Sequence, residues 1–215
     1  MKNFIVICCL LLINCSSGGK TSLSQNANPY FPLDKGNKWT YSVDEYSLSA
    51  KVYDLVEIDN DLFAALEEKS IRRNEPPISR ALYYRFDDRG NIERILPDVE
   101  SLRSNVGSSP NIPRSGRSVW YKLDAKIDES WVAFGNSVFN GKEIHQFEIA
   151  LLSRSDTVIV KDKVFTGCYK FYIDDLSESD TEYYDWLAKG VGLVKRSYGS
   201  DESKALKLSI FEKSH

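Results

Sequence analysis

Apolar and polar residues alternate with a period of two along much of the chain, which is typical of strands with one buried face. The clearest run predicts an apolar face made by Leu48, Ala50, Val52, Val56 and Ile58. Three later runs alternate in the same way: Leu82–Phe86, Phe147–Leu151 and Leu206–Ile210. Trp39–Val43 is also rich in strand-forming residues. The chain is therefore expected to be built mainly from β-strands.

Turn-forming residues separate these runs at the spacing of β-hairpins. Asp88–Asn91 and Lys161–Lys163 each lie between two apolar segments. Asn140-Gly141 is the strongest turn signal, because both residues tolerate a positive φ. No long helical period interrupts the pattern. We predict an all-β or mainly β fold: an antiparallel sheet that forms an open half-barrel or a barrel.

Three segments depart from this pattern. Residues 62–70 have good helix propensity, and Ser179–Glu182 resembles a helix capping box with Gly190 as a stop for residues 179–189. We nevertheless expect strands in both. Residues 97–118 are rich in Pro, Gly, Ser and Arg, and they predict a long loop of the kind that is often functional.

The N-terminus predicts an exported, lipid-anchored protein. A short positive start precedes the apolar run Phe4–Ile13, which has the length of a signal-peptide core and is too short to span a membrane. The run ends at Cys15 in a pattern that resembles a bacterial lipobox, although Asn14 departs from the usual small residue. We expect residues 1–14 to be a lipoprotein signal peptide and Cys15 to carry the lipid. Cys8 and Cys9 are weaker candidates, because little apolar sequence precedes them.

The lipid would hold the chain firmly on a membrane, since acyl chains act together. Ser16 after the modified Cys resembles an outer-membrane sorting signal. Residues 15–28 are then a flexible tether, rich in Ser, Gly and Asn, and residues 29–215 form one β-rich domain. The expected location is the outer membrane of a bacterial envelope, on either its periplasmic or its outer face.

Composition and cysteine content agree with this picture. The 215 residues are 42% hydrophobic and carry a net charge of −3, and no basic stripe points to a nucleic-acid partner. Of four cysteines, only Cys168 lies beyond the tether, so no disulfide is expected within the domain. Cys168 lies in a strand-like run and is expected to be a buried, inert thiol.

Two segments resemble uncharacterised envelope lipoproteins that are common in Bacteroidota. They are Tyr30–Leu33 followed by Gly36–Tyr41, and the run Trp186–Lys195 with its Gly-Val-Gly-Leu-Val-Lys sequence. The resemblance covers the two ends of the domain. It implies an all-β fold such as an open half-barrel, and it brings no catalytic residues. From the residues themselves, Gly190 and Gly192 predict a tight or bulged turn, with Trp186 and Leu193 packed on either side.

Signals of enzymatic chemistry are weak. The chain has no Gly-x-Ser-x-Gly, His-Glu-x-x-His, P-loop or Cys-x-x-Cys motif, and it has two histidines, His145 and His215. An acidic stretch offers oxygen ligands of the type that Ca²⁺ takes, but without the spacing of a calcium loop, so a solvated loop is the favoured interpretation. Its members are Asp174, Asp175, Glu178, Asp180 and Glu182. We expect no catalytic residue, metal or cofactor.

Aromatic residues are the remaining feature. They indicate either an apolar ligand cavity or an ordinary sheet core, which is the usual role of strand aromatics. They are Trp39, Trp120, Tyr121, Trp131, Tyr169, Phe171, Tyr172, Tyr183, Tyr184 and Trp186. The expected function is non-enzymatic: a lipid-anchored binding or interaction domain that holds a lipophilic ligand. The alternative is an accessory that docks to another envelope protein through a sheet edge.

Overall fold

The computed structural model describes residues 28–96, 115–136, 144–199 and 205–214. Cys15, most of the predicted tether, the Asn140-Gly141 turn and residues 97–114 of the predicted loop lie outside the described residues. Within the described part of the chain, no helix is long and apolar enough to cross a membrane.

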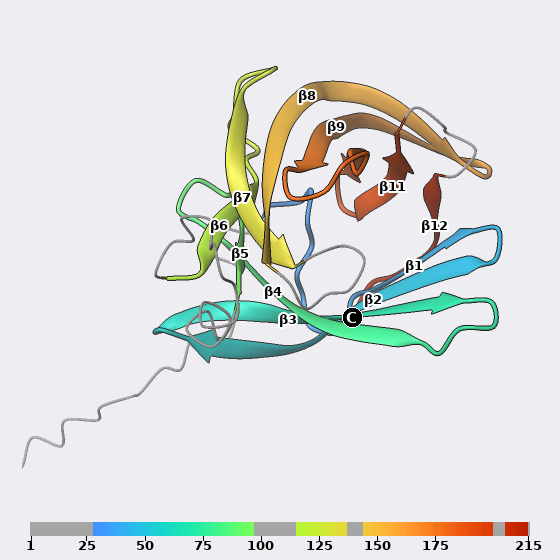
Figure 1. Ribbon diagram of the computed structural model, residues 1–215, viewed down its shortest axis with the longest axis horizontal. Helices are drawn as coiled ribbons and strands as arrows, with labels where there is room; N and C mark the ends of the chain where they lie inside the picture. The colour runs from blue at the N-terminus through green and yellow to red at the C-terminus, as the bar shows by residue number, and fades with distance from the viewer. Residues whose placement is uncertain (1–27, 97–114, 137–143, 200–204, 215) are drawn as a thin grey trace, which may run out of the picture.

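The described residues form one antiparallel sheet of twelve strands (Figure 1). The strands are β1 (Lys38–Val43), β2 (Tyr46–Ile58), β3 (Asp61–Arg72), β4 (Ile78–Phe86), β5 (Ile92–Ile95), β6 (Arg117–Tyr121), β7 (Ser130–Asn136), β8 (Ile144–Val160), β9 (Lys163–Asp175), β10 (Tyr183–Ala188), β11 (Gly192–Tyr198) and β12 (Leu206–Glu212). Except for β6 and β7, which are the two edge strands, strands adjacent in sequence are neighbours in the sheet, and β1 pairs with β12. This confirms the predicted fold class.

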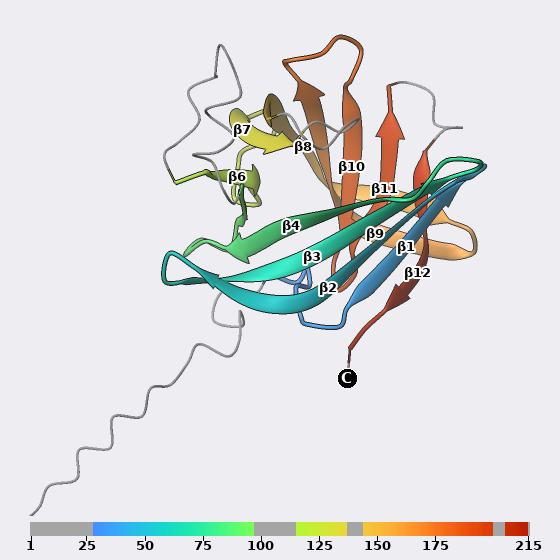
Figure 2. The ribbon, with the colours of Figure 1, turned by 60° about the horizontal axis from the view of Figure 1, so that its bottom comes forward.

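The sheet curves until its two edge strands, β6 and β7, lie beside each other, so that it forms a nearly closed barrel. In Figure 2, β2, β3 and β4 cross in front of β9, β10 and β11 as the opposite wall. Side chains bridge the two edges. The Ser118 hydroxyl donates to Phe134 O at 3.2 Å and accepts from Phe134 N at 3.1 Å. Trp131 Nε1 donates to Val119 O at 2.9 Å. The edges are thus joined without a backbone ladder.

Two predicted faces are interrupted by irregular pairing. Val52 pairs with Leu66, but the next residue paired is Asp54, so the core-facing side of β2 continues at Leu55 and no longer at Val56 and Ile58. The prediction that all five apolar residues share one face was therefore wrong beyond Val52. A bulge moves every later side chain to the other face, because the side-chain period of a strand is two.

The same effect acts near the C-terminus. The β1–β12 register shifts between Thr40 and Tyr41, so Leu208 is buried while Ile210 is exposed. The predicted common face of Leu206, Leu208 and Ile210 was wrong for the last residue. The extra residue, Ser209, lies within the β12 side of the ladder, between the partners of Thr40 and Tyr41.

Both segments with mixed signals are strands. Residues 62–70 lie within β3, and β10 occupies most of residues 179–189, which confirms both predictions. Each of these strands pairs with a neighbouring strand on both sides, and this pairing outweighs the helix propensity of the segment. The predicted loop at 97–118 was too long at its C-terminal end, because β6 begins at Arg117.

The two segments that carry the family resemblance lie against each other. Gly190 N donates to Pro29 O at 2.6 Å, and the Trp39 indole N–H donates to Val191 O. Gly192 has φ +92°, and a Cβ there would lie 3.5 Å from Pro32 Cδ. The Tyr41 hydroxyl donates to Leu193 O at 3.1 Å. The predicted glycine turn is confirmed, and the start of the domain packs against it.

Candidate functional site

Charged side chains share the inner face of the barrel with the apolar core. Arg94 follows buried Ile92 by two residues, and Asp185 lies between buried Tyr183 and Leu187. Because side chains on one face of a strand recur every second residue, these charged groups point inward. The name inner cluster is given to Glu68, Arg80, Arg94, Asp185 and Arg196. Asp175, two residues after buried Ile173 on the same face, pairs separately with His145.

Two arginines of the inner cluster face a carboxylate on the neighbouring strand. Arg196 lies opposite Asp185, and its Nε and Nη2 donate to the two carboxylate oxygens at 2.7 Å each. The Tyr121 hydroxyl adds a hydrogen bond to Asp185 Oδ2 at 2.6 Å. Arg80 lies opposite Glu68, and its Nε donates to Glu68 Oε2 at 2.6 Å. Each carboxylate therefore accepts a charge-assisted hydrogen bond from a guanidinium on the neighbouring strand.

The electrostatics of these groups agree with that geometry. Burial alone would raise the pKa of the Glu68 carboxyl, but Arg80, with help from Arg196 and Arg94, holds that pKa below its usual range. Burial raises the pKa of Tyr121 well above its ordinary value, and the charge of Asp185 raises it further. The phenol consequently stays protonated and donates its hydrogen bond.

Arg94 has no such partner. Its side chain is buried, with 3% of the residue exposed, and it makes no ion pair with any carboxylate in the described ranges. Nη2 donates to Asn136 Oδ1 at 2.9 Å, and the guanidinium lies 4.9 Å from the centre of the Trp120 ring. Nε has no hydrogen-bond partner. Burial lowers the pKa of Arg94 from its ordinary value.

The sequence analysis missed the inner cluster, although it contained a usable signal. Ile92 and Arg94 are two residues apart in a strand-like run, and so are Asp185 and Leu187. A charged residue on the apolar face of a predicted strand is a candidate for a buried functional group. The alternation was used only for its apolar positions, and it carried no expectation for Arg94 or Asp185.

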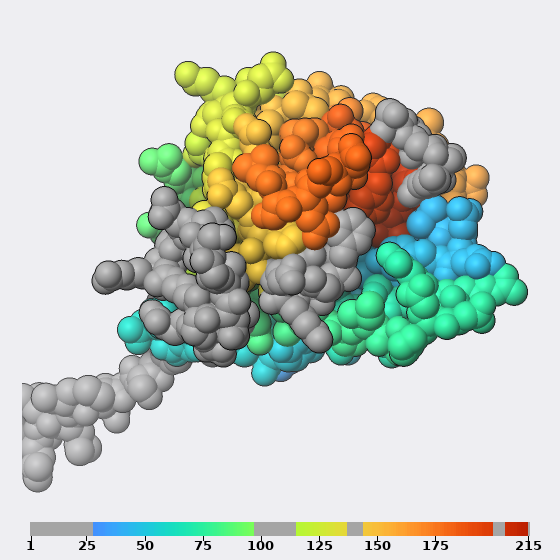
Figure 3. All heavy atoms as spheres, in the orientation of Figure 1, coloured from blue at the N-terminus to red at the C-terminus, as the bar shows by residue number. Residues whose placement is uncertain are grey.

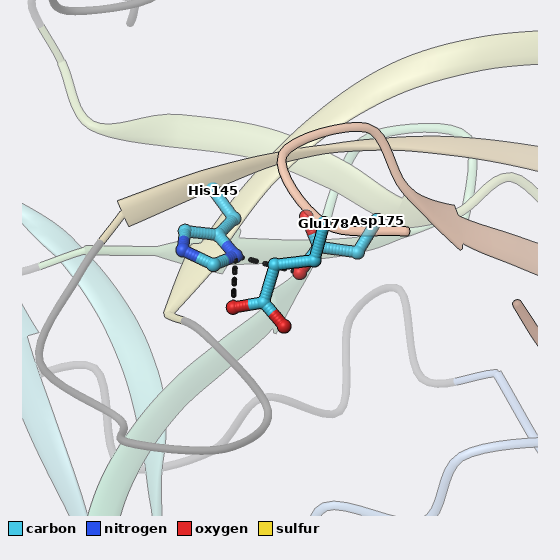
Figure 4. Close-up of side chains that lie close together, drawn as sticks. All are labelled: His145, Asp175 and Glu178. Carbon is cyan, nitrogen blue, oxygen red and sulfur yellow. Dashed lines mark hydrogen bonds and ion pairs between the residues drawn. The ribbon is translucent and has the colours of Figure 1, made fainter. Parts of the chain in front are cut away.

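A second group of polar residues gathers where β8 begins and β9 ends (Figure 4). His145 Nδ1 lies 2.6 Å from Asp175 Oδ2 and 3.7 Å from Glu178 Oε1. The second ring nitrogen of His145 points away from both carboxylates (Figure 4). One nitrogen and two oxygen donors within 4.8 Å of one another are a ligand set that Zn²⁺ or Mn²⁺ accepts.

Local structure accounts for the position of these groups. Asp175 Oδ1 accepts from Ser177 N at 3.0 Å, and the Thr181 hydroxyl donates to Asp175 O at 3.2 Å. Leu176 N donates to Gln146 O at 2.8 Å. Together with His145, these bonds tie the turn that follows β9 to the start of β8. We therefore interpret the group as a buried polar staple of this turn.

The acidic stretch does not converge as one cluster. Asp175 and Glu178 turn toward His145, whereas Asp174 lies near Glu182 and Glu148. Burial and the charges of Glu182 and Glu148 raise the pKa of Asp174. This mutual repulsion is typical of solvated carboxylates on a loop and its flanking strands.

Cys168 is a buried thiol, as predicted. Burial raises its pKa to about 11, and the nearby Asp156 acts in the same direction. Its Sγ contacts Phe165 O at 3.5 Å. A thiol with a raised pKa is a poor nucleophile, because the reactive species is the thiolate. Cys168 is therefore a packing residue.

The aromatic residues mostly pack against one another inside the barrel. Trp120 and Phe147 lie 5.1 Å apart, and Tyr121 and Phe171 lie 5.0 Å apart, as measured between ring centres. In the space-filling view of Figure 3, atoms of the yellow and orange strands lie against one another on this face of the molecule. A hollow of about 320 Å³ lies elsewhere, beside the β1–β2 turn and the end of β3. Its lining is Val43, Asp44, Glu45, Tyr46, Arg72 and Arg73.

The fold and the inner cluster define a nearly closed antiparallel β-barrel with a charged interior. The chain matches no protein-family model and no curated protein. It is similar to the structure of a candidate lipoprotein from Parabacteroides distasonis, with a TM-score of 0.46, 13% identity, and coverage of 87% of this chain and 100% of that chain. It is also similar to a candidate exported protein with a YmcC-like fold from Bacteroides fragilis, with a TM-score of 0.45, 14% identity, and coverage of 85% and 98%. Neither similarity assigns a function to this chain.

Proposed function

We propose that this chain is a lipid-anchored, non-enzymatic binding module of the bacterial envelope, with the barrel interior as its binding element. The anchor is Cys15, and Ser16 favours the outer membrane as the site of attachment. One observation carries the binding part of the proposal: the inner cluster contains Arg94, a buried guanidinium that forms no ion pair with a described carboxylate and whose Nε has no hydrogen-bond partner.

Burying charged groups is costly, and apolar side chains of similar volume often stabilise a core equally well or better. A barrel that retains five charged residues on its inner face therefore has a reason other than stability to keep them. Neither inner carboxylate is placed as a general base, because Asp185 is held by Arg196 and Glu68 by Arg80. This supports a binding role over a catalytic one.

The ligand chemistry differs from the lipophilic ligand expected from the aromatic residues. Those rings fill the barrel by packing against one another, whereas the unmatched group inside it is a cation. Docking of a partner strand at a sheet edge also has less support, since β6 and β7 cover each other's edges through Ser118 and Trp131.

Anchoring is tested by mass spectrometry of the mature N-terminus after expression of the full-length protein in a bacterial envelope. We expect a chain that begins at Cys15 and carries the mass of its acyl chains. The Cys15→Ser variant should lose this mass and leave the membrane fraction. An unmodified mature peptide that begins before Cys15 would contradict the anchor.

Binding is tested on the same Cys15→Ser chain, secreted through an ordinary signal peptide and measured intact by native mass spectrometry. We expect a reproducible additional mass after gentle purification. A bare chain mass under several growth conditions would contradict the binding role.

A further inference from the structure

The three arginines of the inner cluster differ in what lies across the strand from them. Arg80 faces Glu68, and Arg196 faces Asp185. Arg94 faces Tyr84 on one side and Ser118 on the other. Residues directly opposite on one face are the natural interaction partners in a sheet. The sheet thus provides a counter-charge for two of the arginines and none for the third.

The charge balance of the cluster follows from this difference. Within the inner cluster, three guanidinium groups face two carboxylates, and the third buried carboxylate on this face, Asp175, lies against His145 instead. A buried charge without a partner costs several kcal/mol, so proteins that retain one have a use for it or supply a counter-ion. Tyr84, Arg80, Glu68 and Tyr183 act electrostatically on Arg94, so the charge of Arg94 is felt across this part of the barrel.

Arg94 occupies a place built for its guanidinium. A Cβ on Gly135 would lie 2.9 Å from Arg94 Nη1 and 3.0 Å from Trp120 Cζ3. Glycine at this position therefore leaves room for the guanidinium against the indole ring. Asn136, the next residue of β7, accepts from Nη2 at 2.9 Å. These contacts fix the group and leave its Nε without a partner.

The inner cluster also reaches the solvent. The side chains of Glu68 and Arg80 are 14% and 26% exposed, whereas Arg94 is almost fully buried. Arg80 and Tyr84 lie on the same face of β4, so the cluster extends along this strand from the exposed pair toward Arg94. An anion that approaches the exposed end meets the Arg80–Glu68 pair first and the guanidinium of Arg94 beyond it.

We propose that Arg94 binds an oxyanion group of the ligand, a carboxylate or a phosphate, inside the barrel. This inference rests on the proposed function and names the chemistry of the ligand. Arginine suits the role because its planar guanidinium donates in a fixed fork that matches both oxyanions. Tyr84, directly across the strand, is the neighbouring hydroxyl donor.

The competing role for Arg94 is structural. Through Asn136 it joins β5 to β7 across the seam between β6 and β7. The two roles of Arg94, as a structural brace or as an anion-binding residue, predict opposite changes in the stability of the ligand-free protein when its charge is removed. Loss of a brace destabilises the ligand-free protein, whereas loss of an unmatched buried charge leaves its stability unchanged or raises it.

The test uses the secreted Cys15→Ser chain and measures its melting temperature in chloride buffers of constant ionic strength. The probes are inorganic phosphate, acetate, glycerol 3-phosphate and vesicles that contain phosphatidylglycerol. The variants are Arg94→Met, Arg94→Lys and Asn136→Ala. Arg89→Met is the matched control, since that side chain is 75% exposed.

We expect at least one oxyanion probe to raise the melting temperature by about 3 °C or more in a dose-dependent manner. Arg89→Met should keep this shift, Asn136→Ala and Arg94→Lys should each keep part of it, and Arg94→Met should lose it. Without a probe, Arg94→Met should melt at or above the temperature of the parent chain. The most effective probe separates carboxylate from phosphate, and a response to vesicles alone assigns the phosphate to a lipid headgroup.

The proposal is overturned if no probe shifts the parent chain, or if Arg94→Met retains the full shift. A lower melting temperature of ligand-free Arg94→Met, matched by Asn136→Ala, would assign Arg94 to the seam instead. These outcomes are independent of the Cys15 measurement. A lipid-free N-terminus overturns the anchor, whereas an additional native mass without an oxyanion group overturns this inference alone.

Discussion

Two arginine clusters lie on opposite faces of the sheet, and they differ in how the arginine charges are paired with carboxylates. On the outer face, Arg85 and Arg117 flank the Phe63 ring at 5.7 and 5.4 Å. Asp61 pairs with both at 2.8 and 2.5 Å, and Glu93 pairs with Arg85 at 2.6 Å. On the inner face, one arginine of three has no carboxylate among the described residues.

The comparison shows which feature marks a site. Arg117 also has an Nε without a hydrogen-bond partner, yet its Nη1 is paired with Asp61. An unpartnered nitrogen is therefore not sufficient by itself. The distinguishing feature of Arg94 is that its guanidinium is buried and forms no ion pair with a carboxylate among the described residues. The paired arginines are accounted for by their contacts within the protein, whereas burial of Arg94 carries a cost that these contacts do not offset.

The largest expected effect comes from breaking the matched pair on the inner face. Asp185→Asn removes the charge that Arg196 faces and leaves a second buried guanidinium unmatched. We expect a loss of about 3–5 kcal/mol in the free energy of unfolding, measured by urea denaturation. Asp61→Asn in the outer cluster is the control and should cost less, since its side chain is 30% exposed. Equal losses in both variants would remove the distinction between the clusters.

A smaller effect is expected from crowding Arg94. Gly135→Ala places a Cβ 2.9 Å from Nη1, 3.0 Å from Trp120 and 3.1 Å from Phe147. Overpacking of this kind costs about 1–3 kcal/mol, which thermal unfolding resolves. Ser130→Ala, at an exposed position of the same strand, should behave as the parent chain. Parent-like stability of Gly135→Ala would show that the guanidinium moves without cost.

The outer cluster should tolerate the loss of one partner. Glu93→Gln leaves Arg85 paired with Asp61 at 2.8 Å, so the guanidinium keeps a counter-charge. We expect a loss of about 1 kcal/mol by urea unfolding. A loss as large as that of Asp185→Asn would indicate that the outer arginines are as poorly matched as Arg94.

The smallest effect concerns acid sensitivity. The pKa of Glu68 is lowered in the folded state, so its contribution to stability is present above its unfolded-state pKa, near the ordinary value of 4.5. That contribution is lost as the pH falls through the lower folded-state pKa. The free energy of unfolding of Glu68→Gln should therefore depend less steeply on pH in this acidic range. Parallel pH profiles for variant and parent would show that the Arg80 pair does not perturb Glu68.

Much of the fold could be predicted because the signals were local. The hairpin at Lys161–Lys163 and the strand Trp39–Val43 follow from turn residues and β-propensity alone. Which face of the sheet the side chains occupy after Val52, and at Ile210, could not be predicted. A bulge depends on how two strands fit each other, and a one-residue shift reverses every later side chain.

The candidate site was less accessible from the sequence than the fold. Alternation places Arg94 on the same face as Ile92, but it does not say which strands lie beside β5. The counter-charges of Arg80 and Arg196 come from neighbouring strands, and the contacts of Arg94 include Asn136 on the far side of the barrel seam. A charge is recognised as unmatched only when all its neighbours are known.

The sequence by itself determined the β-rich class, most hairpins, the inert environment of Cys168 and the expectation of a lipid anchor at Cys15. These depend on residues close together in the chain, where period, turn chemistry and short motifs act. Only the tertiary structure decided that β1 pairs with β12, that Trp39 meets Val191, and that Arg94 is buried without a counter-charge. Barrel closure brings distant residues together, and burial in its interior turns an ordinary arginine into a costly and selective group.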